Sequence, residues 1–272
     1  IEDSGDMARI YKEILRDNGK IEELEKQDIE EKLGNILWWV SNIARKTNLS
    51  LSDIAKKNID TTKDRWAPKE QRERSPLFDR EYPADQQLPD KMDIYFKPTD
   101  VENEKKILMF VKDIHGNEIP LGDRLDDNSH EEDGYRYHDV FHLAYYAILG
   151  WSPVIRALLK RKRKKIIDPK VNVDKVEDGA RAILIEEGLT AYVFQYAKRG
   201  DKYFKGETTV DTRILKTIKM LTSHLQVKVC KSYEWEESIL AGYRIFNEIK
   251  VATKGCVHIN LQDRSISFTP EK

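Results

Sequence analysis

The feature that most constrains the fold of this chain is an apolar stripe at helical spacing between residues 27 and 47. The stripe comprises Leu33, Ile36, Leu37, Val40, Ile43 and Ala44. Apolar residues three and four positions apart lie on one face of an α-helix, and that face must be covered by another surface. Similar stretches span residues 6–17 and 50–66, so the chain is predicted to begin with three packed helices. A segment is expected to precede Ile1, because the chain lacks an initiator Met and enters a helical pattern almost at once.

A change of pattern follows these helices. Four prolines stand among charged residues over 67–89, where no helical stripe is visible, and we predict a linker there. Apolar runs beyond it predict strands over 92–97 and 107–113 and a terminal hairpin over 257–269. Five further helices are predicted, over residues 135–149, 153–165, 176–199, 212–225 and 228–250. Ser152-Pro153 is a suitable N-cap and first-turn pair for the second of them.

These patterns predict a mainly α fold. A helical domain occupies residues 1–66, a linker residues 67–89, and a mostly helical domain with small β elements residues 90–272. The 272 residues carry a net charge of -1, which gives no global attraction to nucleic acid or to an anionic membrane. No apolar run approaches the roughly 18–20 residues that span a bilayer. Only two cysteines occur, Cys230 and Cys256, which favours a reducing, cytoplasmic compartment over a disulfide framework.

Three short segments of the first 66 residues together resemble one known family. Residues 2–8 (EDSGDMA) are similar to its pattern EEAGEVA, and residues 32–39 (KLGNILWW) to ELGDVLWY. The stretch from Leu51, with Asn58 and Arg65, is similar to LSLEEIAxxNxxKLxxR, and the predicted turn over 15–19 lies where that family leaves its first helix. This is the helical core of MazG-type nucleotide pyrophosphohydrolases. Residues 90–269 also resemble the C-terminal domain found behind that core in a subset of MazG-like proteins.

The resemblance implies a site at which this chain departs from the family. MazG-type enzymes hold Mg²⁺ or Mn²⁺ with acids from an ExxE pair and an ExxD pair, and the corresponding positions here are Asp3, Asp6, Lys32 and Asn35. Asp3 and Asp6 can still ligate a metal, whereas Lys32 brings a cation and Asn35 only a neutral carbonyl. Implied substrate-binding positions are Trp39, Asn58 and Arg65, while Thr61 replaces the usual phosphate-binding lysine.

Two functions therefore stay open for the first domain. One is hydrolysis of a (d)NTP to a (d)NMP and pyrophosphate, supported by Mg²⁺. The other is a catalytically impaired nucleotide-binding or assembly module, in which Lys32 pairs with Asp3 or Asp6. A homo-oligomer is expected in either case, because MazG-type cores build their site from several chains and three helices bury little alone.

A second candidate site appears in the later helices. His138 and His142 are four residues apart on one helical face with Asp139 beside them, and Glu186 and Glu187 lie in another apolar helix. Imidazoles at this spacing can share a metal ion. A buried carboxylate needs a partner, so the same residues also fit a polar network that fixes helix packing. His224 is a more remote candidate.

Two smaller features are predicted to be structural. The run of six basic residues over 160–165 is expected to be a solvated helix end, so nucleic acid is not an expected partner. Trp235, Tyr243 and Phe246 fall near helical spacing and are expected in the core.

Overall fold

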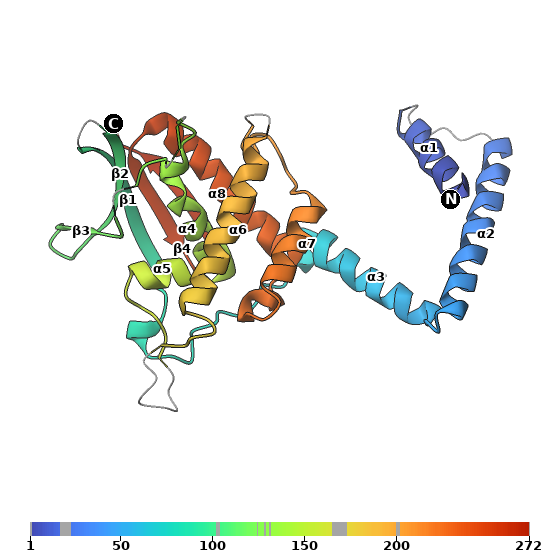
Figure 1. Cartoon of the computed structure of the whole chain (residues 1–272), viewed down its shortest axis with the longest axis horizontal. Helices are drawn as coiled ribbons and strands as arrows, with labels where there is room; N and C mark the ends of the chain where they lie inside the picture. The colour runs from blue at the N-terminus through green and yellow to red at the C-terminus, as the bar shows by residue number, and fades with distance from the viewer. Residues whose placement is uncertain are drawn as a thin grey trace. The chain divides into compact units, whose positions relative to one another are not determined.

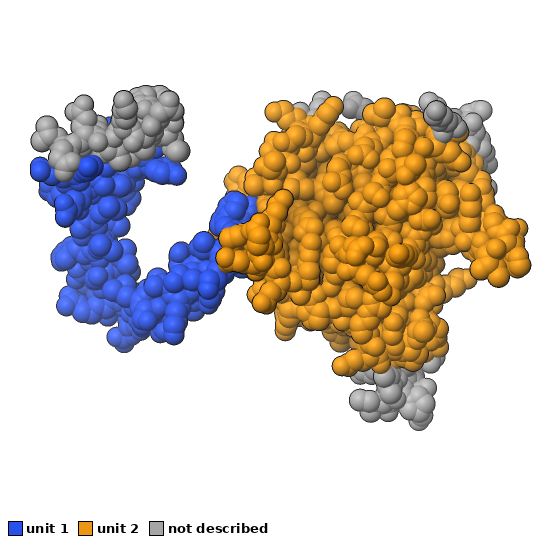
Figure 2. Space-filling view, turned by 180° about the vertical axis from the view of Figure 1, so that it is seen from behind, with its two compact units in different colours: residues 1–66 blue, residues 67–272 orange. Residues whose placement is uncertain are grey.

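The computed structural model of the chain describes eight stretches of it (Figure 1). These are residues 2–16, 23–101, 104–123, 125–127, 129–130, 132–164, 173–199 and 202–271. The chain divides into two compact units, residues 1–66 and 67–272, which are coloured separately in Figure 2. The segment over 67–89, predicted as a linker, is counted with the second unit. Most of the predicted turn over 15–19, and Lys165 of the basic run, lie outside the described residues.

The first unit is three helices. They are α1 (Glu2–Arg16), α2 (Glu23–Lys46) and α3 (Leu51–Trp66). Ser50 caps α3 by accepting a hydrogen bond from the backbone N–H of Asp53 at 3.3 Å. Helix α1 packs against α2, yet much of the α2 stripe stays uncovered: the exposed fractions of Leu37 and Ile43 are 66% and 58%. The described residues of the first unit therefore do not provide the cover that an amphipathic helix requires.

The second unit contains a five-stranded antiparallel sheet. Its strands are β1 (Lys91–Val101), β2 (Glu104–Lys112), β3 (Glu118–Pro120), β4 (Gly255–Asn260) and β5 (Ser265–Pro270). They lie in the order β3-β2-β1-β4-β5. The predicted hairpin over 257–269 is the β4–β5 pair, and it joins the early strands because Ile94 of β1 pairs with Val257 of β4. The predicted small β elements are thus one sheet.

Helices pack on one face of this sheet. They are α4 (Asp139–Leu149), α5 (Pro153–Leu158), α6 (Ala180–Lys198), α7 (Thr212–Leu221) and α8 (Ser232–Ala252). Short 3₁₀ turns cover Lys69–Gln71, Ala84–Gln86, Tyr135–Tyr137 and Gln226–Val229. Helices α4 and α8 contact each other and β5, and every residue of α4 is buried. Among the described residues, no helix combines the length and the apolar character needed to cross a membrane.

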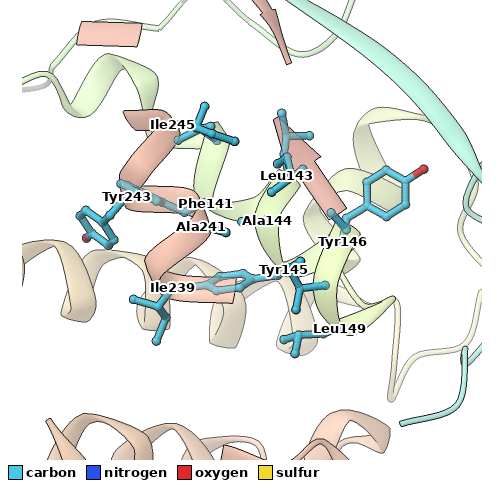
Figure 3. Packing of buried hydrophobic residues seen from close by; sticks show 14 of the residues in the cluster. Phe141, Leu143, Ala144, Tyr145, Tyr146, Leu149, Ile239, Ala241, Tyr243 and Ile245 are labelled. Atoms are coloured by element: carbon cyan, nitrogen blue, oxygen red, sulfur yellow. The ribbon is translucent and has the colours of Figure 1, made fainter. Parts of the chain in front are cut away.

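The α4–α8 contact forms the centre of the core (Figure 3). The helices approach closely at Gly242, where an added Cβ would lie 3.1 Å from the Cβ of Ala144 and 3.2 Å from Phe141. Figure 3 shows aromatic and aliphatic side chains of both helices filling the space around this point. The predicted core residues Trp235, Tyr243 and Phe246 are at most 2% exposed, which confirms their assignment.

The basic run differs from its prediction. Helix α5 ends at Leu158, so residues 161–164 are irregular rather than helical, and Arg163 is only 1% exposed. Its guanidinium donates to both carboxylate oxygens of Asp178, at 2.9 and 2.7 Å. Arg156 of α5 pairs with Asp79 at 2.5 Å, and Asp79 also accepts from the backbone N–H of Leu88 at 2.7 Å. Buried ion pairs thus tie the 67–89 segment and part of the basic run into the core.

Candidate functional site

The predicted metal positions of the first unit hold an ion pair. The ammonium of Lys32 lies 3.6 Å from the carboxylate of Asp6 and 2.9 Å from that of Asp28, one turn away on α2. The hydrogen bond to Asp28, and then the charges of Asp28 and Asp6, raise the pKa of Lys32 above its ordinary value, against the opposing effect of burial. Asn35 is exposed. The residues present do not fit the four-acid magnesium site of the resemblance, because a cation already neutralises Asp6.

The predicted substrate-binding residues of this unit lie on two helices. Trp39 on α2 is 54% exposed, and its ring meets that of Trp38 edge to face at 5.0 Å between centroids. Asn58 on α3 is exposed, and the guanidinium of Arg65 lies 4.7 Å above the ring of Trp66. The exposed indoles give α2 a large apolar surface.

The second unit brings the other five predicted residues together. His138 and His142 stand at the start of α4 with their rings 5.9 Å apart, and α6 presents Glu186 and Glu187 to them. Atom Nδ1 of His142 is 2.9 Å from Oε1 of Glu186, and both side chains are fully buried. Atom Nε2 of His142 lies 3.3 Å from Oε2 of Glu187, whose side chain is 39% exposed. One imidazole therefore lies between two carboxylates.

The carboxylate of Glu186 is held in place by the start of α5. The hydroxyl of Ser152 donates to its Oε1 at 2.6 Å, and the backbone N–H of Val154 donates to its Oε2 at 2.8 Å. Ser152 also caps α5, as predicted, by accepting from the N–H of Ile155 at 3.0 Å. The cap was visible in the sequence, whereas its second role at Glu186 was not, because only the fold brings α5 to α6.

The electrostatics of the cluster favour a charged histidine when nothing else is bound. Burial alone lowers the pKa of His142, but the nearby charges of Glu186 and Glu187 outweigh it and raise that pKa to about 10. Burial alone raises the pKa of Glu187, but the contact with His142 outweighs burial and lowers that pKa below its ordinary value. The imidazole therefore interacts strongly with both acids.

His138 and Asp139 complete the group. Atom Nδ1 of His138 is 2.9 Å from the carbonyl oxygen of Tyr135, and its Nε2 is 3.8 Å from Oδ1 of Asp139. The ring of Tyr135 stacks on that of His138 at 4.5 Å, a partner that sequence reasoning did not identify. The more remote candidate, His224, is exposed. We call His138, Asp139, His142, Glu186 and Glu187 the α4–α6 cluster.

A large cleft in the second unit has a different lining. Its volume is about 1310 Å³, and cations and aromatic rings meet in it, among them Arg72, Arg74, Phe204, Arg244 and Phe268. No residue of the α4–α6 cluster lines it. Arg74 is bound to both carboxylate oxygens of Glu237 at 2.7 and 2.8 Å. The group that combines histidines with carboxylates is thus outside this cleft, and the chemistry of the unit is better sought in the cluster.

Fold and cluster define the second unit as an α+β domain that buries histidines among carboxylates at a helix–helix contact. Comparison with known proteins gives the family: the model described as the MazG C-terminal domain matches residues 73–272, and the chain belongs to that family. The chain is also similar to the gene 37 protein of Mycobacterium phage L5, with 30% identity over 64 residues. That stretch is 23% of this chain and 56% of the phage protein. No solved structure matches the chain.

Proposed function

We propose that residues 1–66 form a MazG-like helical core that acts as a nucleotide-binding or assembly module with an impaired magnesium site. The observation that carries the proposal is the 3.6 Å ion pair between Lys32 and Asp6. Mg²⁺ and the ammonium group compete for the same carboxylate, and Asn35 contributes no negative charge. The family of the second unit supports a MazG-like assignment of the first, because the matching family model describes the C-terminal domain of MazG.

Assembly is supported by the uncovered face of α2. Leu37 is 66% exposed, Val40 40% and Ile43 58%, although all three are large apolar side chains of the one stripe. Soluble proteins rarely leave such a contiguous patch open to water, so it is expected to mark an interaction surface. We propose that a second copy of the chain covers it, because homo-oligomers usually form through one patch that two copies share.

A second candidate function is hydrolysis of a (d)NTP to a (d)NMP and pyrophosphate, with Mg²⁺ or Mn²⁺ held by Asp3 and Asp6. What favours it is the spacing of these acids three residues apart on α1, which places them on neighbouring positions of one helix face. In this reaction water attacks a phosphorus atom and pyrophosphate leaves. Because Lys32 would have to release Asp6 before a metal could bind, we rank the hydrolase function below the impaired module.

The two functions differ in turnover, and one double variant distinguishes them. The wild type is incubated with a panel of dNTPs and Mg²⁺ or Mn²⁺ while pyrophosphate release is measured. We expect no turnover, and a heat of binding for a non-hydrolysable nucleotide in calorimetry. Lys32→Glu combined with Asn35→Asp restores acids at both positions and should raise pyrophosphate release at least about tenfold above the assay background.

The control for this experiment is Lys57→Glu, which makes the charge change of Lys32→Glu at an exposed lysine on α3. It should leave turnover unchanged. Robust pyrophosphate release by the wild type that disappears in Asp6→Ala would contradict the impaired module and establish the hydrolase instead.

A further inference from the structure

We propose that the α4–α6 cluster is a binding site for one divalent transition metal ion, with His138, Asp139 and His142 as ligands and Glu187 facing the remaining position. Glu186 is assigned as a positioning residue. This proposal concerns the second unit and is independent of the function proposed for the first.

The helix spacing places the ligands on one side of α4. His138 and His142 are separated by one helical turn, so their side chains project in the same direction, and Asp139 lies beside the first of them. Ligand atoms of these three residues all lie within 4.8 Å of one another. Two histidines at positions i and i+4 on one helix face are an arrangement that holds zinc in metalloproteins.

The hydrogen bonds leave one nitrogen of each ring directed toward this point. Nδ1 of His142 faces the carboxylate of Glu186 and Nδ1 of His138 faces a backbone carbonyl, both at 2.9 Å, so each Nδ1 carries a proton and donates it. In a neutral ring Nε2 then offers a lone pair. Metal-binding imidazoles usually donate the proton of their other ring nitrogen to a carboxylate or a carbonyl in this way.

Atom Nε2 of His142 is a buried polar atom without a hydrogen-bond partner in the described structure. Oε2 of Glu187 lies 3.3 Å from it, in an ion-pair contact that lacks hydrogen-bond geometry. Bonds of about 2.1 Å around a tetrahedral ion place neighbouring ligand atoms about 3.4 Å apart. The separation of these two atoms therefore fits two ligands of one ion, which would take the place of the Nε2 proton.

The charges of the cluster call for a cation. Asp139, Glu186 and Glu187 contribute three carboxylates, and among the described residues no lysine or arginine forms an ion pair with them. Asp139 and Glu186 are nearly or fully buried. Buried carboxylates are costly unless paired, and a divalent ion bound among them would contribute two positive charges.

The donor set indicates which ions fit. Imidazole nitrogen and carboxylate oxygen suit Zn²⁺, Mn²⁺, Fe²⁺ and Co²⁺. Ca²⁺ prefers six to eight oxygen ligands, and no thiolate is present to select a soft ion. Glu187 is the most exposed member of the cluster, so an ion would enter from its side.

The test measures metal binding by the full chain without an affinity tag. The protein is stripped with a chelator and titrated with Zn²⁺ in calorimetry and with Co²⁺ in visible absorption. We expect one ion per chain, with Co²⁺ bands typical of nitrogen and oxygen ligands. His138→Gln, at a half-buried position, and the isosteric Asp139→Asn should each weaken binding at least about 100-fold while the melting temperature still shows a folded protein.

Glu186→Gln tests the positioning role, because the amide keeps the shape but loses the charge. It should lower Zn²⁺ affinity by about 10- to 100-fold and shift the Co²⁺ spectrum while one ion still binds. The matched control is His258→Gln, in the other described group that could hold an ion, Asp93, Cys256 and His258, where His258 pairs with Asp93 at 2.8 Å. It should bind as the wild type does. The proposal is overturned if the stripped wild type takes up no ion, if His138→Gln and Asp139→Asn bind unchanged, or if binding is lost with His258→Gln instead.

Discussion

At the scale of single residues, the second unit depends on buried charges that satisfy one another. Arg163 and Asp178 are each about 1% exposed at their side chains and share two short hydrogen bonds. Desolvating two such charges is costly, and good geometry offsets that cost only while both partners are present. Losing one partner is therefore much more damaging than losing both.

This difference gives a stability prediction. Asp178→Asn should lower the free energy of unfolding by about 3 kcal/mol, because it leaves the guanidinium of Arg163 buried without its counter-charge. Replacing both residues, as Arg163→Met with Asp178→Leu, should cost less than the single change. Urea unfolding measures all three proteins. Arg213→Ala, at the exposed Arg213–Asp211 pair, is the control and should not shift the midpoint.

Some contacts between single residues could be predicted from the sequence, and others could not. Two local signals placed the cluster residues in one group. His138 and His142 are four residues apart on one helix, and Glu186 and Glu187 are acids in an apolar helix. The sequence reading also allowed Lys32 to pair with Asp6, which the structure shows. The burial of Arg163 could not be predicted, since its partner Asp178 lies 15 residues further along the chain.

At the scale of elements, helices were predicted more closely than strands. The predicted and observed ranges of the three early helices overlap along most of their lengths, because each has its own apolar period. The pairing of β1 with β4 joins residues such as Ile94 and Val257, and no local pattern specifies such a contact. For the same reason the contacts of Tyr135 and Ser152 with the α4–α6 cluster were found only in the structure.

The uncovered stripe of α2 yields a prediction at this scale. If a second copy covers it, Leu37→Glu should shift the chain from an oligomer to a monomer, because a charge would be buried unpaired in the shared surface. Light scattering coupled to size-exclusion chromatography measures the mass. Ile114→Glu is the matched control, since Ile114 is 95% exposed in the second unit and outside the stripe. A monomeric wild type, or an oligomer that Leu37→Glu leaves intact, would contradict the proposed surface.

At the scale of the whole molecule, the two units differ in how many apolar side chains each one buries. The main hydrophobic cluster, with the side chains packed against it, lies between Leu77 and Phe268. In the described part of residues 1–66, Ala44 is the single apolar side chain that is buried. Three helices with so little burial are marginal alone, whereas about 200 residues around a continuous core are not.

The last prediction follows from this asymmetry. A fragment of residues 67–272 should unfold cooperatively, with a melting temperature within a few degrees of the main transition of the full chain, because it keeps the entire cluster. A fragment of residues 1–66 at low concentration should melt broadly, and its helicity should rise with concentration as copies cover the α2 stripe. Circular dichroism over a range of concentrations measures both fragments. A 67–272 fragment without a cooperative transition would show that its core needs the first unit, and concentration-independent helicity in the 1–66 fragment would show that it does not need a second copy.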